Sequence, residues 1–349
     1  MAEKVVRMGI VGMTTDHVWG MGDSLAALPT AELVTGAEPY EELRQQAQER
    51  FHLKTVYEDY EEMLTKEEVD AILVCGDNAV KADVVEAAAK HGVHVYQDKP
   101  MAATLAQADR IHTVAEESGI KVMVAYHTYF SASYGKVKEW LDEGKIGDVY
   151  LARALIGHAG PKEIGCSKYF CEWLFDKERN GGGTFVDEGC YAVSTFLDYL
   201  GEVEEVSSFM TQMGWRDYLP PDVEDNSVTI LRFKSGALGV LDSKWGQIGP
   251  MPFGSSYHGT EGTITATWTG LSIYSRKALP PELQGWVELP GRRQPRPGVG
   301  SEAEYFVNCL LEDRLIEGAV SPRGARAAQE VIEAAYRSAE TGQVVKLPL

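Results

Sequence analysis

The residues "GIVGMTTDHVWG" (9–20) begin within a short apolar run at 5–11 and lead into a helical pattern. A strand, a glycine turn and a helix in this order are typical of the start of a dinucleotide-binding fold, whose phosphate loop has the spacing G-x-G-x-x-G. Counted from Gly12, that spacing falls on Gly12, Thr14 and His17. The stretch therefore predicts the fold, and it raises the question of how a phosphate would be held with the other two glycines missing.

Short apolar runs continue to alternate with amphipathic stretches through the first third of the chain. Runs rich in Val and Ile recur at 32–36, 71–75, 93–96 and 121–125. Helical patterns separate them, at 18–28, 40–51, 81–91 and 105–118. Because strands covered by helices on both faces are apolar throughout, this pattern predicts a parallel, doubly wound sheet. We assign it to an N-terminal α/β domain of the Rossmann type, residues 1–126.

The pattern changes after Tyr126. Alternating strand patterns occur at 149–156, 203–212, 227–233, 237–245, 263–268 and 271–274, and helical patterns at 134–143, 302–312 and 323–341. The residues "FKSG" (233–236) indicate a hairpin turn. We predict a second α/β domain, residues 127–349, with a large, open and mostly antiparallel sheet. Residues 279–300, rich in Pro, Gly and Arg, are interpreted as a surface loop, a lid or a subunit contact.

Composition narrows the classes of function. The chain of 349 residues carries a net charge of −19, which opposes binding to nucleic-acid phosphates. No apolar run is long enough to cross a bilayer and the N-terminus has no signal-peptide pattern, so we expect a cytoplasmic protein without membrane partners. The five cysteines are then expected to be reduced thiols. Cys166 and Cys171 match no common zinc spacing, so no metal is expected.

The loop itself offers substitutes for the missing glycines. Cofactor contacts are expected from Gly12, Met13, Thr14, Thr15 and Asp16. A threonine hydroxyl and the N–H groups at the helix start could hold a phosphate. We expect Asp16 to cap the helix and to point away from the phosphates. His17 and Trp19 could line the cofactor cleft, or Trp19 could be buried in the first helix; the alternative for the whole loop is a fold that has lost its cofactor.

An acid and a lysine stand where such folds place ligand contacts. Glu38 lies about twenty residues beyond the loop, the offset expected of an acid that binds ribose hydroxyls and disfavours a 2′-phosphate. We therefore expect NAD rather than NADP. Lys99 and Pro100 follow a strand at its carboxyl end, where open α/β sheets bind ligands. A lysine held there could neutralise a developing alkoxide, although Lys-Pro after a strand is also common in surface turns.

The stretch "NGGGTFVDEGCYAVSTFLDYLG" (180–201) carries a second candidate site. Its three glycines are expected to open a helix and to expose N–H groups. Asp187 and Tyr191 are four residues apart, so they share a helix face and could form a proton-handling pair. The alternative is a packing helix with one surface carboxylate and one half-buried tyrosine.

Together these motifs resemble the Gfo/Idh/MocA family of sugar and cyclitol oxidoreductases. The resemblance covers essentially the whole chain and is carried by "GIVG" (9–12), Glu38, "QDKP" (97–100), "LDEGKIGDV" (141–149), "GGGTFVDEGCYAV" (181–193), "DNSVTILRFKSGALG" (225–239) and "GTEGTI" (259–264). It implies hydride transfer between NAD(P) and a hydroxyl-bearing carbon of a sugar, a sugar derivative or a cyclitol, in an active site between the two domains. An open sheet in the second domain is a plausible dimer surface, so we expect a homodimer or homotetramer.

The resemblance also implies roles for single residues. Lys99 corresponds to the lysine that contacts nicotinamide and substrate, in "DKP" (98–100) where relatives have Glu-Lys-Pro. Asp187 corresponds to the family's aspartate, and Tyr191 stands where a histidine is usual, so a tyrosine would take the hydroxyl proton. Asn78 matches the asparagine of the usual Thr-Pro-Asn and is expected to contact the cofactor, as is Pro100.

Substrate contacts are expected from His127, Tyr129, His158, Lys162 and Trp173. The family's Asn-x-Arg-Phe reads "HTYF" at 127–130, so contacts in that region are expected to differ. The last three residues are second-domain candidates for a polyol, since sugar sites often pair an aromatic ring with hydrogen-bonding groups. Two rival functions stay open: a glycosidase that oxidises and re-reduces its substrate with bound NAD, and a non-catalytic protein that senses a cofactor or a sugar.

Overall fold

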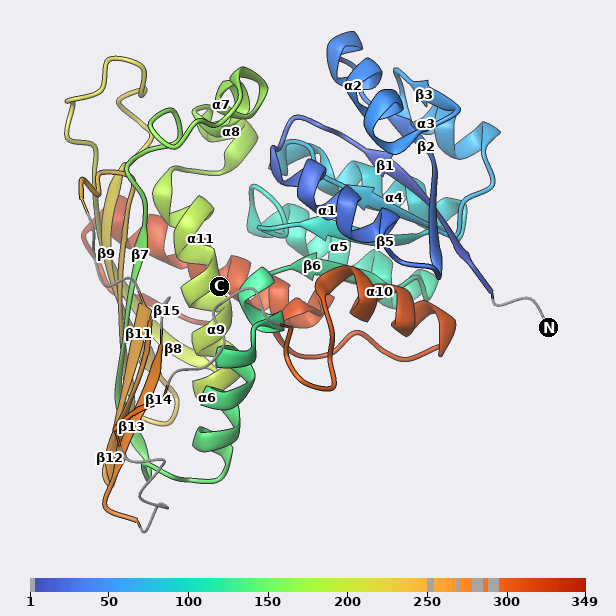
Figure 1. Cartoon of the computed structure of the whole chain (residues 1–349). Helices are drawn as coiled ribbons and strands as arrows, with labels where there is room; N and C mark the ends of the chain where they lie inside the picture. Colours follow the sequence, from blue (N-terminus) through green and yellow to red (C-terminus); the bar gives the residue numbers. More distant parts are fainter. Residues whose placement is uncertain (1–3, 250–253, 268–269, 278–284, 288–294) are drawn as a thin grey trace. The chain divides into compact units, whose positions relative to one another are not determined.

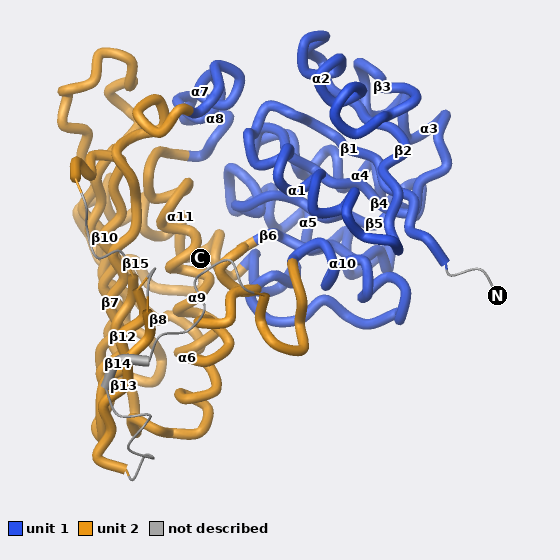
Figure 2. Tube along the Cα trace, in the orientation of Figure 1, with its two compact units in different colours: residues 1–125, 166–181, 302–326 blue, residues 126–165, 182–301, 327–349 orange. Residues whose placement is uncertain are grey.

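The computed structural model describes residues 4–249, 254–267, 270–277, 285–287 and 295–349. The chain forms two compact units, which are coloured separately in Figure 2. Unit 1 comprises residues 1–125, 166–181 and 302–326, and unit 2 comprises residues 126–165, 182–301 and 327–349. The predicted domains, 1–126 and 127–349, are each continuous in sequence, whereas each compact unit is built from three segments.

Unit 1 contains a six-stranded parallel sheet in the order β3-β2-β1-β4-β5-β6 (Figure 1). Its strands are β1 (Val6–Val11), β2 (Ala31–Ala37), β3 (Thr55–Tyr57), β4 (Ala71–Val74), β5 (His94–Asp98) and β6 (Val122–Ala125). The order reverses between β1 and β4, and such a reversal places a ligand crevice at the carboxyl ends of the strands. The predicted parallel sheet is confirmed. Strand β3 was not predicted, because three residues at a sheet edge form no recognisable apolar run.

Helices cover this sheet where the sequence predicts them (Figure 1): α1 (His17–Ala26), α2 (Glu41–Phe51), α4 (Lys81–Lys90) and α5 (Leu105–Ser118). The boundaries of α5 follow from local chemistry, because Thr104 and Gln107 form a reciprocal capping box and Gly119 ends the helix at a φ of 75°. Unit 1 also contains α3 (Tyr60–Lys66), α7 (Lys168–Leu174), α8 (Lys177–Asn180), α10 (Glu302–Leu311) and the short 3₁₀ turns η1 (Asn78–Val80) and η5 (Gly318–Val320).

Unit 2 is built on a sheet with the strand order β14-β13-β12-β11-β7-β10-β9-β8-β15. The strands are β7 (Val149–Gly157), β8 (Val203–Thr211), β9 (Asn226–Phe233), β10 (Leu238–Lys244), β11 (Gly254–Gly259), β12 (Gly262–Thr267), β13 (Leu271–Ser275), β14 (Gly285–Val287) and β15 (Val345–Lys346). Neighbours pair antiparallel except β10 and β7, which are parallel, so the mostly antiparallel sheet is confirmed. The "FKSG" hairpin joins β9 to β10, with Gly236 at a φ of 88°.

The helical elements that begin in unit 2 are η2 (His127–Phe130), α6 (Ala132–Asp142), the π-helical turn η3 (Phe185–Gly189) and α9 (Cys190–Leu200), and α11 (Pro322–Thr341) crosses the division at residue 327. Figure 1 shows α6 and α9 beside the sheet. Most of the predicted loop at 279–300 lies outside the described residues, so its interpretation as a surface loop, a lid or a subunit contact stays a prediction.

The strands of unit 2 carry exposed apolar side chains on one face. Val228 and Ile230 on β9 are 41% and 44% exposed, and Phe209, directly opposite Val228 on β8, is 75% exposed. A second copy of the chain could pack on this face, and the homodimer or homotetramer stays a prediction. Among the described residues, no helix combines the length and the apolar composition that a membrane crossing requires.

Candidate cofactor and substrate sites

The turn after β1 keeps the one glycine that its backbone requires. Gly12 has a φ of 74°, in the left-handed region that favours glycine. A Cβ atom at this position would lie 2.8 Å from the Cα atom of Gly76, in the turn after β4. The two turns therefore touch at the point where the strand order reverses, and no side chain fits between them.

The two threonines of the loop differ in their contacts. The Thr15 N–H donates to the Cys75 carbonyl (3.1 Å), and the residue is only 1% exposed. Its Oγ1 atom is buried without a hydrogen-bond partner among the described residues. The Thr14 hydroxyl lies 3.5 Å from Asp77 Oδ1. Since a buried hydroxyl without a partner costs stability, Thr15 is suited to a ligand that completes its hydrogen bonding.

Asp16 does not cap α1 with its side chain, contrary to the prediction. It occupies the N-cap position with helical backbone angles (φ −59°, ψ −18°), whereas a side-chain cap needs an extended backbone. Its carboxylate instead accepts a hydrogen bond from the Ser167 N–H (2.7 Å), at the start of α7. The first turn of α1 is therefore left without a side-chain cap, and a cofactor contact of Asp16 stays a prediction.

Glu38 is fully buried at the end of β2. Its carboxylate accepts hydrogen bonds from the N–H groups of Met13 (2.6 Å) and Tyr40 (3.0 Å). Burial raises the pKa of the Glu38 carboxyl, although these two hydrogen bonds act in the opposite direction. The carboxylate thus holds the loop after β1 in place, and each oxygen retains the capacity to accept a second hydrogen bond.

Residues 166–181, here called the α7–α8 segment, pack on the carboxyl edge of the unit 1 sheet. Arg179 Nε donates to Asp77 Oδ2 (2.6 Å), and Asn78 Nδ2 donates to Asn180 Oδ1 (2.8 Å). Asp77 and Asn78 follow β4, so the segment lies against the residues that follow the strands near the reversal. Asn78, the predicted cofactor contact, is completely buried beneath it.

Lys99 and Pro100 form a turn at the end of β5, and a second, buried lysine holds this turn in place. Lys81 Nζ donates to the carbonyls of Asp98 (2.7 Å) and Pro100 (2.8 Å) and to Asn78 Oδ1 (2.8 Å). Lys81 is 1% exposed and Lys99 is 4% exposed. One ammonium group therefore connects Asn78, after β4, with the Lys99 turn, after β5.

The residues of this edge fit a dinucleotide. The Gly12 turn brings the backbone to the edge, and the Thr15 hydroxyl has no partner among the described residues. The Glu38 carboxylate follows β2 and accepts the Met13 N–H, and Asn78 and Lys99 follow β4 and β5. All five belong to unit 1, and their contact with a cofactor stays a prediction.

The glycines at 181–183 allow close packing and do not expose a helix N-terminus, contrary to the prediction. The Glu224 carboxylate accepts hydrogen bonds from the N–H groups of Gly183 (2.8 Å) and Phe185 (2.9 Å) and from the Tyr336 hydroxyl (2.7 Å). A Cβ atom at Gly183 would lie 2.0 Å from the Glu224 carbonyl oxygen. The N–H groups at this helix start are therefore already satisfied within unit 2.

Asp187 and Tyr191 make different contacts. Asp187 lies in the π-helical turn η3, and Tyr191 lies in the first turn of α9, which follows it directly. Their predicted role as a proton-handling pair stays a prediction. Asp187 Oδ2 accepts a hydrogen bond from Trp245 Nε1 (3.0 Å). The Tyr191 ring packs edge-on against the His127 ring, with centroids 4.4 Å apart.

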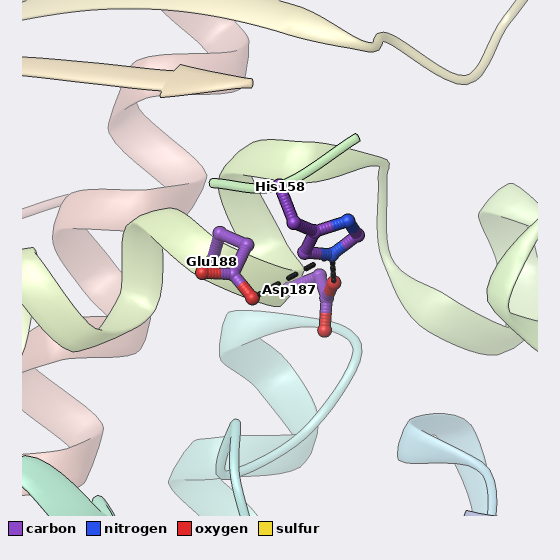
Figure 3. Close-up of side chains that lie close together, drawn as sticks. All are labelled: His158, Asp187 and Glu188. Atoms are coloured by element: carbon purple, nitrogen blue, oxygen red, sulfur yellow. Dashed lines mark ion pairs between the residues drawn. The ribbon is translucent and has the colours of Figure 1, made fainter. Parts of the chain in front are cut away.

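Asp187 forms a cluster with His158 and Glu188 (Figure 3). His158 Nε2 lies 3.8 Å from Asp187 Oδ2 and 3.7 Å from Glu188 Oε1. The Asp187 side chain is 8% exposed and that of Glu188 is 20% exposed. Figure 3 shows both carboxylates directed toward the same imidazole nitrogen.

The donor set of this cluster suits a hydroxyl group better than a metal ion. The Gly160 N–H donates to His158 Nδ1 (3.0 Å), so a neutral imidazole carries its hydrogen on Nε2. A metal-binding Nε2 needs its lone pair, and a ligating histidine normally donates from its other nitrogen. An N–H group beside two carboxylates offers what a polyol hydroxyl needs, one donor and one acceptor.

Tyr191 is 5% exposed and lines a cavity of about 110 Å³ inside unit 2. Thr128, Thr195 and Ser255 also line it. His127 is exposed and its ring contacts that of Tyr191, whereas Tyr129 is buried and packs against Tyr134. Of these two predicted substrate residues, His127 is therefore accessible, whereas Tyr129 is part of the core of unit 2.

The remaining predicted contacts lie elsewhere. Trp173 belongs to α7 in unit 1 and not to the second domain, because the α7–α8 segment packs with the first sheet; it is 3% exposed and contacts Phe170. Lys162 Nζ lies over the Tyr218 ring, 4.3 Å from its centre. Trp19 stacks on Phe51 of α2, with centroids 6.1 Å apart.

Sequence reasoning also missed Trp245 and Glu224, which lie 58 and 41 residues from the groups they bind.

The fold and these two groups of residues define a class of protein. Residues 6–126 match the oxidoreductase family with an NAD-binding Rossmann fold, and residues 134–265 match the GFO/IDH/MocA C-terminal domain. The chain therefore belongs to the Gfo/Idh/MocA family, as its motifs predict, and its first unit has the NAD(P)-binding Rossmann fold of these oxidoreductases.

Several known proteins similar to the chain are dehydrogenases of sugars or cyclitols. The myo-inositol 2-dehydrogenase of Thermotoga maritima is 27% identical over 242 residues, which cover 68% of each chain. The NADP⁺-using D-xylose 1-dehydrogenase of Haloarcula marismortui is 24% identical over 292 residues, covering 83% of this chain and 78% of the relative. The structure of a levoglucosan dehydrogenase with NADH and levoglucosan has the same fold, with a TM-score of 0.83 over 99% of this chain and all of that one, at 19% identity.

Proposed function

We propose that this protein is an NAD(P)-dependent oxidoreductase that transfers a hydride between nicotinamide and a hydroxyl-bearing carbon of a sugar, a sugar derivative or a cyclitol. The observation that carries the proposal is the buried Asp187 carboxylate, which Trp245 holds and the His158 Nε2–H faces. A polyol matches this cluster because each hydroxyl both donates and accepts. The similarity to inositol, xylose and levoglucosan dehydrogenases supports the same class of substrate.

In this proposal the nicotinamide, when bound, supplies the hydride chemistry, and side chains of the chain handle the proton. Tyr191 takes the proton of the substrate hydroxyl. A free tyrosine has a pKa of about 10, so it needs a cation such as Lys99 to act as a base near neutrality. Lys99 also stabilises the alkoxide, and Asp187 orients the substrate. The reverse direction reduces a ketone or an aldehyde by the same groups.

Cofactor binding is the first test. Protein stripped of cofactor, titrated by calorimetry with NADH and then with NADPH, is expected to bind NADH at least about tenfold more tightly, because the Glu38 carboxylate repels a 2′-phosphate. Glu38→Gln should narrow that ratio, whereas Glu41→Gln, which changes an exposed acid of α2, should not. Binding of neither nucleotide would contradict the proposal and favour the sugar-sensing function.

A polyol screen then separates a dehydrogenase, which accumulates reduced nicotinamide, from a glycosidase that recycles it.

Tyr191→Phe tests the assigned base. We expect turnover to fall by about two orders of magnitude or more, because the proton acceptor is lost, while NADH affinity changes by less than about twofold. Steady-state hydride transfer and calorimetry measure the two quantities. Tyr274→Phe removes the same hydroxyl from a 65% exposed residue of β13 and should leave both unchanged. Near-normal turnover of Tyr191→Phe would rule out a tyrosine base.

A further inference from the structure

His17 stands at the third glycine position of the loop and pairs with a buried carboxylate. It is the first residue of α1, and its Nδ1 atom lies 2.9 Å from Asp98 Oδ2, at the end of β5. The Asp98 side chain is 6% exposed, whereas that of His17 is 41% exposed. The imidazole therefore rests on a buried acid and keeps a surface that a ligand can reach.

The charge of Asp98 fixes the orientation of the imidazole. Burial raises the pKa of the Asp98 carboxyl. The charge and hydrogen bond of His17 and the charges of Lys81 and Lys99 together lower it by more, so the pKa lies below its ordinary value. An ionised carboxylate only accepts, so Nδ1 carries a hydrogen. Nε2 then carries a hydrogen only in the imidazolium form, and in that form it can donate to a second anion. The Phe170 ring packs edge-on against the imidazole, with centroids 5.9 Å apart.

The groups next to His17 also suit an anion. The Thr15 hydroxyl, two residues earlier, is buried without a partner among the described residues, and Thr15 is 1% exposed. Helix α1 is ten residues long, and its first turn has no side-chain cap because the Asp16 carboxylate bonds to Ser167. The N-terminus of a helix carries a partial positive charge and unpaired N–H groups.

We propose that His17 is a phosphate ligand that compensates for the missing glycines. In the imidazolium form, its Nε2–H donates to the pyrophosphate of a bound dinucleotide, beside the Thr15 hydroxyl and the start of α1. Negative charge then lies on both sides of the ring, from Asp98 and from the phosphate, and this stabilises the imidazolium. A charged side chain thus makes the contact with the pyrophosphate that the closely approaching backbone makes in a glycine-rich loop. The inference rests on the cofactor binding proposed above.

His17→Gly tests this role sharply, because it restores the third glycine of the loop. The full chain, His17→Gly and His17→Gln are titrated with ADP, which contains the pyrophosphate, and with adenosine, which lacks it. ADP affinity should fall roughly ten- to hundredfold in both variants, since a charge-assisted hydrogen bond is lost, and adenosine affinity should not change. His112→Gln on α5 is the matched control and should bind both ligands as the unmodified chain does.

Two results would overturn the inference. ADP binding by His17→Gly as tight as that of the unmodified chain would mean that a glycine serves the loop as well. Equal losses of ADP and adenosine affinity would mean that His17 supports the crevice through Asp98 and does not contact phosphate. His17→Gln carries the test if the glycine variant unfolds, which urea denaturation detects. Failure of the unmodified chain to bind ADP and NADH would instead count against the proposed function.

Discussion

Lys81→Met is expected to lower the free energy of unfolding by about 3–5 kcal/mol. Methionine keeps an unbranched side chain of similar length but has no hydrogen-bond donor. The carbonyls of Asp98 and Pro100 and the side-chain amide oxygen of Asn78 would lose the ammonium that they now share. Each buried acceptor left without a partner costs on the order of 1 kcal/mol or more, so the three losses together account for the expected size.

The same substitution is expected to lower kcat/KM by about tenfold or more, through position alone. Lys81 connects Asn78 with the turn that carries Lys99, and both are proposed to contact the cofactor. Without the connecting ammonium, Asn78 and the Lys99 turn are no longer tied to each other, although Asn78 keeps its hydrogen bond to Asn180.

Urea denaturation followed by circular dichroism measures the change in stability, and steady-state hydride transfer measures the change in turnover. Lys90→Met is the matched control, because Lys90 ends the same helix and is exposed, so its replacement should change stability by less than about 0.5 kcal/mol. If Lys81→Met unfolded at the same urea concentration as the unmodified chain, the three acceptors would have other donors and the role assigned to Lys81 would be wrong.

Lys81 also shows which features the sequence can reveal. It lies on the buried face of α4 with Val84, Val85 and Ala88, so a lysine interrupts an apolar stripe, and that signal could have marked it as unusual. Its partners could not be predicted in the same way. The Asp98 and Pro100 carbonyls are 17 and 19 residues away, and they meet Lys81 only after β5 pairs with β4.

The same distinction separates the predicted from the unpredicted parts of the fold. Helix α5 was predicted at 105–118 and is observed there, because its apolar period and its caps are local. The α7–α8 segment belongs to unit 1 through contacts between residues 151 and 102 positions apart, Asp16 with Ser167 and Asp77 with Arg179. The π-helical turn that contains Asp187 leaves no periodic mark in the sequence either, since it alters a single turn.

Asp187→Asn is expected to lower kcat by about two to four orders of magnitude and to change NADH affinity by less than about twofold. Asparagine has nearly the same shape and can still accept the Trp245 N–H bond, so the fold should be retained. It has no negative charge to orient a substrate hydroxyl. Its amide group would also place a donor near the His158 Nε2–H, where the carboxylate offers only acceptors.

Glu188→Gln is the matched control for this change. Glu188 Oε1 lies 3.7 Å from the same imidazole nitrogen, but the side chain is 20% exposed against 8% for Asp187. A more exposed charge is better solvated and contributes less, so we expect kcat to fall by less than about fivefold. Equal losses in both variants would contradict a special role for Asp187 and assign the effect to the pair of carboxylates.

Dialysis against a chelator completes this test, because a metal ion held by His158, Asp187 and Glu188 would give the same losses in both variants. The Gly160 N–H places the hydrogen of a neutral His158 on Nε2, where a metal ion would need the lone pair. We therefore expect kcat of the unmodified chain to survive chelation. Loss of turnover on chelation and its recovery with a divalent ion would reverse this assignment. Retained turnover, with a large loss in Asp187→Asn alone, identifies the cluster as a binding site for a substrate hydroxyl.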